Sequence, residues 1–128
     1  MLKKPTRELL AEAMAEVETL SVDEARRLHG QGVAVFVDVR DAMELKGSGT
    51  IPAAVHASRG MLEFYIDPES PVHKPAFSSG KRLVFFCGSG GRSALATKTA
   101  RDMGLADVCH IGGGFGAWVN ANGPVDKG

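Results

Sequence analysis

Short apolar runs alternate along the chain with segments of helical character. Residues 33–37 and 83–86 are continuous stretches of β-branched, aromatic and other apolar side chains, the pattern of strands buried on both faces, and residues 108–111 are expected to form a further strand. Segments expected to be helices lie at residues 5–17, 21–30, 93–103 and 115–120. Repeated strand-then-helix units predict an α/β fold with an open, mainly parallel central sheet and helices on both faces.

The first segment predicts an extra N-terminal helix, because Leu9, Leu10, Ala13, Met14 and Val17 form one apolar stripe. Residues 1–18 are therefore expected to form a helical extension, and residues 19–128 a single domain.

Smaller signals add detail between these elements. Ser21 and Glu24 have the spacing of a capping box, and Asp41 is placed to cap a brief helix that ends at Lys46. A loop at 47–49 and a short strand within 51–56 are expected next. The irregular segment 58–80 predicts a functional loop with one turn of helix near 61–65.

Composition narrows the range of functions. The chain has 128 residues, enough for one domain with a core of its own. Fifteen basic and fifteen acidic side chains balance, so nothing indicates a nucleic-acid partner or an anionic membrane surface. No apolar run is long enough to span a bilayer, and the charged N-terminus is unlike a signal peptide, so a cytoplasmic location is expected. The two cysteines are interpreted as separate thiols.

The candidate chemistry lies after the apolar run 83–86. Cys87 is followed by Gly88, Ser89, Gly90 and Gly91, and then by Arg92 and Ser93 at the expected start of a helix. Glycines let a backbone curl so that successive N–H groups point at one place, and a helix start and an arginine also favour negative charge there. These groups are expected to lower the pKa of Cys87. The alternative is an ordinary glycine-rich turn after a buried cysteine.

An ordered set of short motifs resembles the rhodanese domain over residues 19–122. The set comprises Asp38-Val39-Arg40, Glu44, Ile51-Pro52, the loop from Cys87 to Ser93, Gly104, Ile111-Gly112-Gly113 and Ala117-Trp118. The resemblance implies a parallel sheet flanked by helices, and a sulfurtransferase whose cysteine carries sulfur as a persulfide. It implies that Cys87 forms the persulfide, with the amides of Gly88, Ser89, Gly90, Gly91, Arg92 and Ser93 around the outer sulfur and no further cofactor.

The expected substrates are a small sulfur donor, such as thiosulfate or a persulfide, and an acceptor such as cyanide, a thiol or a protein. Arg92 is the only charged side chain in the loop, which weakens the case for thiosulfate as the natural donor. Arg92 either holds the loop and draws in anions or satisfies loop carbonyls. Asp38, Arg40 and Arg59 are predicted to support the site. Arg59 is also expected to frame the mouth of the pocket, together with Phe64, Tyr65 and His73.

Two other classes of function stay open. A Cys-dependent phosphatase or arsenate reductase uses a similar anion cradle, but generally with five residues between cysteine and arginine. Here there are four. A noncatalytic rhodanese-like module that binds proteins or senses redox state is the other alternative.

The remaining motifs predict structure. His29, His56, His73 and His110 lack the spacing of a zinc site, so no metal is predicted. Cys109 is expected to be an inert core residue on the strand face opposite His110. The glycines at 112–116 miss the spacing of a phosphate-binding loop and predict a tight turn, with Trp118 in the core.

Overall fold

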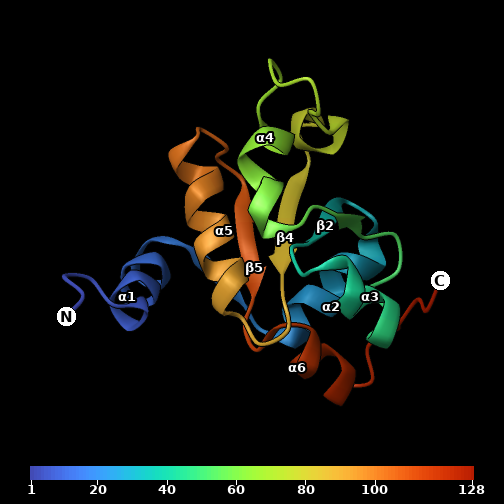
Figure 1. Cartoon of the computed structure of the whole chain (residues 1–128). Coiled ribbons are helices and arrows are strands. Elements are labelled where there is room, and N and C mark those ends of the chain that lie inside the picture. The colour runs from blue at the N-terminus through green and yellow to red at the C-terminus, as the bar shows by residue number, and fades with distance from the viewer.

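The chain folds around one parallel sheet. The computed structural model describes all residues, 1–128. Its five strands lie in the order β1-β5-β4-β2-β3, and every neighbouring pair is parallel. Figure 1 labels the three central strands, β5, β4 and β2. The predicted open, parallel α/β sheet is confirmed. The strands are β1 (Glu18–Leu20), β2 (Ala34–Asp38), β3 (Val55–His56), β4 (Arg82–Phe86) and β5 (Val108–Ile111).

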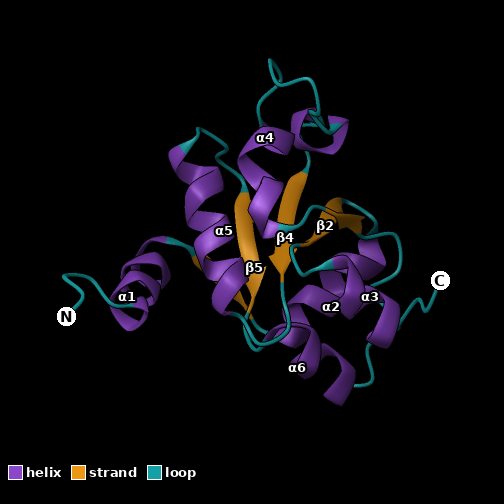
Figure 2. Cartoon of the chain, in the orientation of Figure 1, coloured by secondary structure: helices purple, strands orange, loops and turns teal.

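Helices cover both faces of the sheet (Figure 2). One core cluster joins the sheet to α4 and α5, and a second joins the opposite face to α2 and α6. The expected N-terminal helix is present as α1 and packs against α5. No helix is both long and apolar enough to cross a membrane. The helices are α1 (Thr6–Glu16), α2 (Val22–Gln31), α3 (Ala42–Ser48), α4 (Leu62–Ile66), α5 (Gly91–Asp102) and α6 (Gly114–Asn120), with 3-10 turns at Arg59–Met61 and Pro75–Ser78.

The structure corrects two local predictions, on the end of α3 and the start of α5, and bears out a third. Helix α3 continues through residues 47 and 48, which were expected in a loop, and the Ser48 hydroxyl donates a hydrogen bond to the Glu44 carbonyl within it. The short strand expected within 51–56 is present as β3, which has only two residues and follows a turn at Pro52 and Ala53. Helix α5 begins at Gly91, two residues earlier than predicted, so the glycine-rich loop runs directly into its first turn.

A buried ion pair fixes α3 beside the end of β2. The Arg40 guanidinium donates hydrogen bonds to both carboxylate oxygens of Asp38, at 2.8 to 3.3 Å, and both residues are at most 3% exposed. Arg40 also donates to the Ser48 hydroxyl at 2.9 Å and to the Gly49 carbonyl at 2.7 Å. The Thr50 hydroxyl donates to Asp38 at 2.7 Å. This network ties both ends of the α3 segment to the sheet.

Replacing Arg40 should therefore cost much more than replacing an exposed arginine. Arg40→Met leaves the Asp38 carboxylate buried without its partner, and we expect a loss of about 3–5 kcal/mol in the free energy of unfolding. Arg59→Met, which removes a partly exposed pair with Glu63, should cost less than about 1 kcal/mol. Urea unfolding followed by circular dichroism measures both. Equal costs for the two variants would contradict the role given to the buried pair.

Candidate active site

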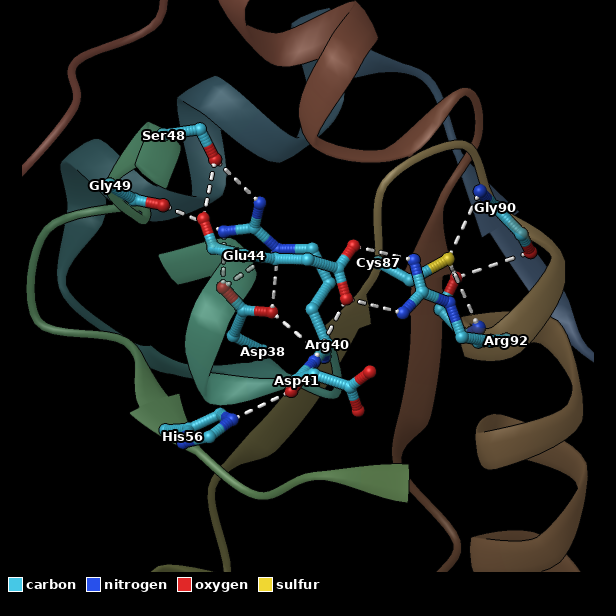
Figure 3. A network of polar contacts seen from close by, with 11 residues as sticks. Asp38, Arg40, Asp41, Glu44, Ser48, Gly49, His56, Cys87, Gly90 and Arg92 are labelled. Carbon is cyan, nitrogen blue, oxygen red and sulfur yellow. Dashed lines mark hydrogen bonds and ion pairs between the residues drawn. The ribbon is translucent and has the colours of Figure 1, made fainter. Parts of the chain in front are cut away.

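The sulfur of Cys87 lies inside the glycine-rich loop between β4 and α5 (Figure 3). It accepts hydrogen bonds from the backbone N–H of Gly90 at 3.1 Å and of Ser93 at 3.4 Å, and lies 3.6 Å from the Ser93 hydroxyl oxygen. Cys87 is 1% exposed, and Ser93 is fully buried. Two of the six loop amides, those of Gly90 and Ser93, therefore point at the sulfur.

The second glycine turn holds this loop in place. The Cys87 carbonyl accepts a hydrogen bond from the Phe115 amide at 2.7 Å, and the Gly88 carbonyl accepts one from Gly116 at 3.0 Å. Gly114 has φ +62°, and a Cβ there would lie 2.4 Å from the Cys87 carbonyl oxygen, so only glycine fits. The predicted tight turn is confirmed, and Trp118 is fully buried in the core behind it.

Burial and hydrogen bonding act in opposite directions on the Cys87 thiol. Burial raises the pKa of Cys87, but hydrogen bonds from the Ser93 side chain and from the loop amides outweigh it. The pKa of Cys87 therefore lies below the usual value for a thiol. A lowered pKa increases the thiolate fraction, which is the nucleophilic form of cysteine.

Arg92 is paired with a carboxylate. Its two terminal nitrogens donate hydrogen bonds to the Glu44 carboxylate at 2.7 and 3.0 Å (Figure 3). The Arg92 side chain donates no hydrogen bond to a carbonyl of the loop. Hydrogen bonds from Arg92 and from the Asp41 amide lower the pKa of Glu44 to about 2. Since the guanidinium lies against Gly88, the pair links α3 to the outside of the loop. Much of the positive charge that the sequence assigns to this site is therefore neutralised.

The predicted supporting residues occupy different places. Asp38 and Arg40 form the buried network beneath α3. The Arg40 guanidinium also lies 4.4 Å from the ring centroid of Phe115, whose amide donates to the Cys87 carbonyl. Arg59 donates to Glu63 and to the Thr99 hydroxyl, and none of its hydrogen bonds goes to the Cys87 loop. His73 bonds the nearby Ser78 hydroxyl.

Sequence reasoning missed the part that β5 plays. His110 is 1% exposed, and its Nδ1 lies 3.2 Å from the Ser93 hydroxyl, on the sheet face opposite Cys109. The alternation of the strand places its side chain on the α5 face, but its partner Ser93 is set only by tertiary packing. No three His, Cys, Asp or Glu side chains come close enough together to hold a metal ion.

Helix α1 borders the site instead of standing apart from it. A hollow of about 230 Å³ lies between α1 and the loop, and Leu10 and Met14 form its wall on the helix side. Gly90, Gly91 and His110 are among the residues on its other side. None of the side chains around the hollow is an acidic residue, a lysine or an arginine.

Residues 21–121 match the family described as the rhodanese-like domain. The chain belongs to the rhodanese-like domain family. This rhodanese-like domain is 48% identical to a solved protein of unknown function from Rhodopseudomonas palustris described as a possible tyrosine phosphatase, with a TM-score of 0.95 and coverage of 98% and 97% of the two chains. It is 32% identical to a human single-domain sulfurtransferase, with a TM-score of 0.70 and coverage of 81% of this chain and 96% of that one.

A curated relative has a named activity. Thiosulfate:glutathione sulfurtransferase from Saccharomyces cerevisiae is 28% identical over 120 residues, which cover 86% of this chain and 84% of that protein. Across the curated relatives, the chain spans from 56% to 84% of their length. The relatives named as sulfurtransferases support a sulfurtransferase-type enzyme in this rhodanese-like domain.

The two cysteines should differ sharply in reactivity. Burial raises the pKa of Cys109 to about 11, which leaves roughly one thiolate in three thousand at pH 7.5. We expect iodoacetamide to label Cys87 at least about a hundred times faster, as measured by peptide mass spectrometry. Denaturation in guanidinium should abolish the difference. Equal labelling of the two thiols in the folded protein would contradict the site geometry.

Proposed function

We propose that this protein is a sulfurtransferase in which Cys87 carries a sulfane sulfur as a persulfide between a donor and a thiophilic acceptor. The observation that carries the proposal is the buried Cys87 sulfur that accepts hydrogen bonds from the amides of Gly90 and Ser93. These donors favour an anionic sulfur, which is both the attacking thiolate and the resulting persulfide.

The proposed reaction is balanced without an added oxidant or reductant. The Cys87 thiolate attacks the outer sulfur of the donor, the S–S bond of the donor breaks, and the leaving group departs with that electron pair. With thiosulfate, the leaving group is sulfite. The acceptor then attacks the outer sulfur of the persulfide, and the Cys87 thiolate is released. No cofactor beyond the transferred sulfur is required for this exchange.

The charge arrangement bears on the donor. Arg92 shares its charge with Glu44, so the backbone amides are the main anion-stabilising groups at the sulfur. A dianion such as thiosulfate gains least from this arrangement, whereas an organic persulfide carries a single negative charge. We therefore favour an organic persulfide donor over thiosulfate. The hollow beside α1, with no formally charged side chain around it, favours a small thiol acceptor.

The phosphatase and arsenate reductase alternative fits less well. An oxyanion with several charged oxygens needs a free cation in the cradle, but the Arg92 guanidinium already donates both terminal nitrogens to Glu44. The Glu44 carboxylate beside it would also repel a phosphate dianion. The lowered pKa of Cys87 argues against a noncatalytic module that only binds proteins, because such a module needs no reactive thiolate.

Direct detection of the persulfide tests the proposal. Incubation with a polysulfide should make the intact protein heavier by one sulfur atom, and cyanide or excess thiol should reverse the change. Cys87→Ser should abolish the mass increase, because the accepting thiolate is lost. Cys109→Ala is the matched control and should keep most of the transfer, since that thiol has no place in the site. Sulfur labelling that survives in Cys87→Ser, or hydrolysis of p-nitrophenyl phosphate in place of sulfur transfer, would overturn the proposal.

Loop length provides a second test. A glycine inserted between Gly90 and Gly91 should widen the cradle and turn the amides away from a single sulfur. We expect sulfur transfer to fall at least tenfold, equivalent to about 1.4 kcal/mol of lost transition-state stabilisation. A glycine inserted between the exposed residues Pro68 and Glu69 is the control and should leave transfer unchanged. If the loop insertion folds and transfers sulfur as well as the parent protein, the amides do not activate Cys87.

A further inference from the structure

A buried chain of hydrogen-bonding side chains leads from the Cys87 sulfur to the edge of the sheet. The Ser93 hydroxyl lies 3.6 Å from the sulfur and 3.2 Å from Nδ1 of His110. Nε2 of His110 lies 2.9 Å from the Thr19 hydroxyl on β1. Cys87, Ser93 and His110 are each at most 1% exposed, so water does not compete for the contacts among these three residues, whereas Thr19 at the end of this hydrogen-bonded chain is exposed.

The surroundings keep His110 neutral. Its neighbours in these contacts and in the sheet are Ser93 on α5, Thr19 on β1 and Phe85 on β4, and none of them is ionisable at neutral pH. The titratable group within reach is Cys87, through Ser93. Burial lowers the pKa of His110, and no carboxylate opposes that effect. A neutral imidazole has one N–H, which either ring nitrogen can carry.

Each tautomer suits one state of the sulfur. With the proton on Nδ1, the Thr19 hydroxyl donates to Nε2, Nδ1–H donates to Ser93, and the Ser93 hydroxyl donates to an anionic sulfur. With the proton on Nε2, the chain runs in the opposite sense, and Ser93 accepts from the Cys87 thiol. Neither arrangement requires a buried cation, and the first directs a donor at the sulfur when it is an anion.

The Ser93 hydroxyl has a competing acceptor. Its single proton can also go to the Gly90 carbonyl, 3.2 Å away. When Nδ1–H donates to the Ser93 oxygen, His110 does not take the hydroxyl proton, and an anionic sulfur attracts that proton more strongly than a neutral carbonyl does. The tautomer of His110 therefore decides whether Ser93 donates to the sulfur.

We propose that His110 is a positioning residue that acts through Ser93, turning the Ser93 hydroxyl toward Cys87 and so stabilising its anionic sulfur. The stabilisation of a persulfide by Ser93 rests on the proposed sulfurtransferase function. The stabilisation of the thiolate in the resting protein is independent of that function. The imidazole of His110 stays neutral throughout the reaction. The proton of the Cys87 thiol passes to solvent.

The pKa of Cys87 tests this role without any sulfur donor. It is measured from the pH dependence of iodoacetamide alkylation at Cys87, by mass spectrometry of the full chain. His110→Gln places its amide near the Nε2 position and leaves Ser93 without a donor, so we expect the pKa of Cys87 to rise by about one unit. His110→Asn places an N–H near the Nδ1 position, so the pKa of Cys87 in this variant should rise by no more than half as much as in His110→Gln.

A double-variant comparison identifies the route of the effect. Ser93→Ala should raise the pKa of Cys87 by a similar amount, and Ser93→Ala with His110→Gln should raise it no further, because both changes break one chain. Cys109→Ala, at the adjacent position on the opposite face of β5, is the matched control and should leave the pKa unchanged. Thermal melting followed by circular dichroism checks that each variant is folded.

Three results would overturn the proposal. They are an unchanged pKa in His110→Gln, equal shifts in the Gln and Asn variants, and additive shifts in the double variant. Failure of the sulfurtransferase function itself is a separate outcome, seen as a parent protein that takes up no sulfur while its Cys87 pKa still responds to His110.

Discussion

The site depends on hydrogen bonds between two glycine turns that are far apart in sequence. The amides at the start of α6 bind the carbonyls of Cys87 and Gly88, at 2.7 and 3.0 Å. A backbone whose carbonyls are held on one side presents its N–H groups on the other, and here those groups meet the Cys87 sulfur. Gly114 makes this approach feasible, since a side chain there would collide with the Cys87 carbonyl.

Negative charge at the sulfur is stabilised mainly by neutral donors. Arg92 stands at the expected position, but its guanidinium is paired with Glu44, whose helix is fixed by the buried Asp38–Arg40 network. The arginine therefore connects α3 to the loop more than it adds free charge to the cradle. Amides and a hydroxyl can stabilise a singly charged sulfur, whereas a tetrahedral dianion would need more cation than this cradle offers.

Two further elements, β5 and α1, also contribute residues around the loop. His110 reaches Ser93 from β5, and Leu10 and Met14 border the hollow beside the loop. The matched family segment begins at residue 21, so α1 adds a wall that lies outside that segment. Variation in α1 can therefore alter the surroundings of the loop without changing the loop itself.

The fold class and the candidate nucleophile follow from sequence because their signals are local. Apolar runs alternate with helical segments, and the loop from Cys87 to Ser93 holds its glycines, cysteine and helix start within a few residues. Each of these patterns depends on spacing along the chain, which the sequence contains directly.

The partners of the site residues depend on tertiary structure. Arg92 and Glu44 are 48 residues apart, and Ser93 and His110 are 17 apart, on elements whose contact is set by strand order. Charge and periodicity identify Glu44 as a helix residue and His110 as a strand residue, but not what each meets. By itself the sequence determined the parallel α/β fold and the cysteine loop, whereas packing of the helices on the sheet decided which charges cancel and which donors reach the sulfur.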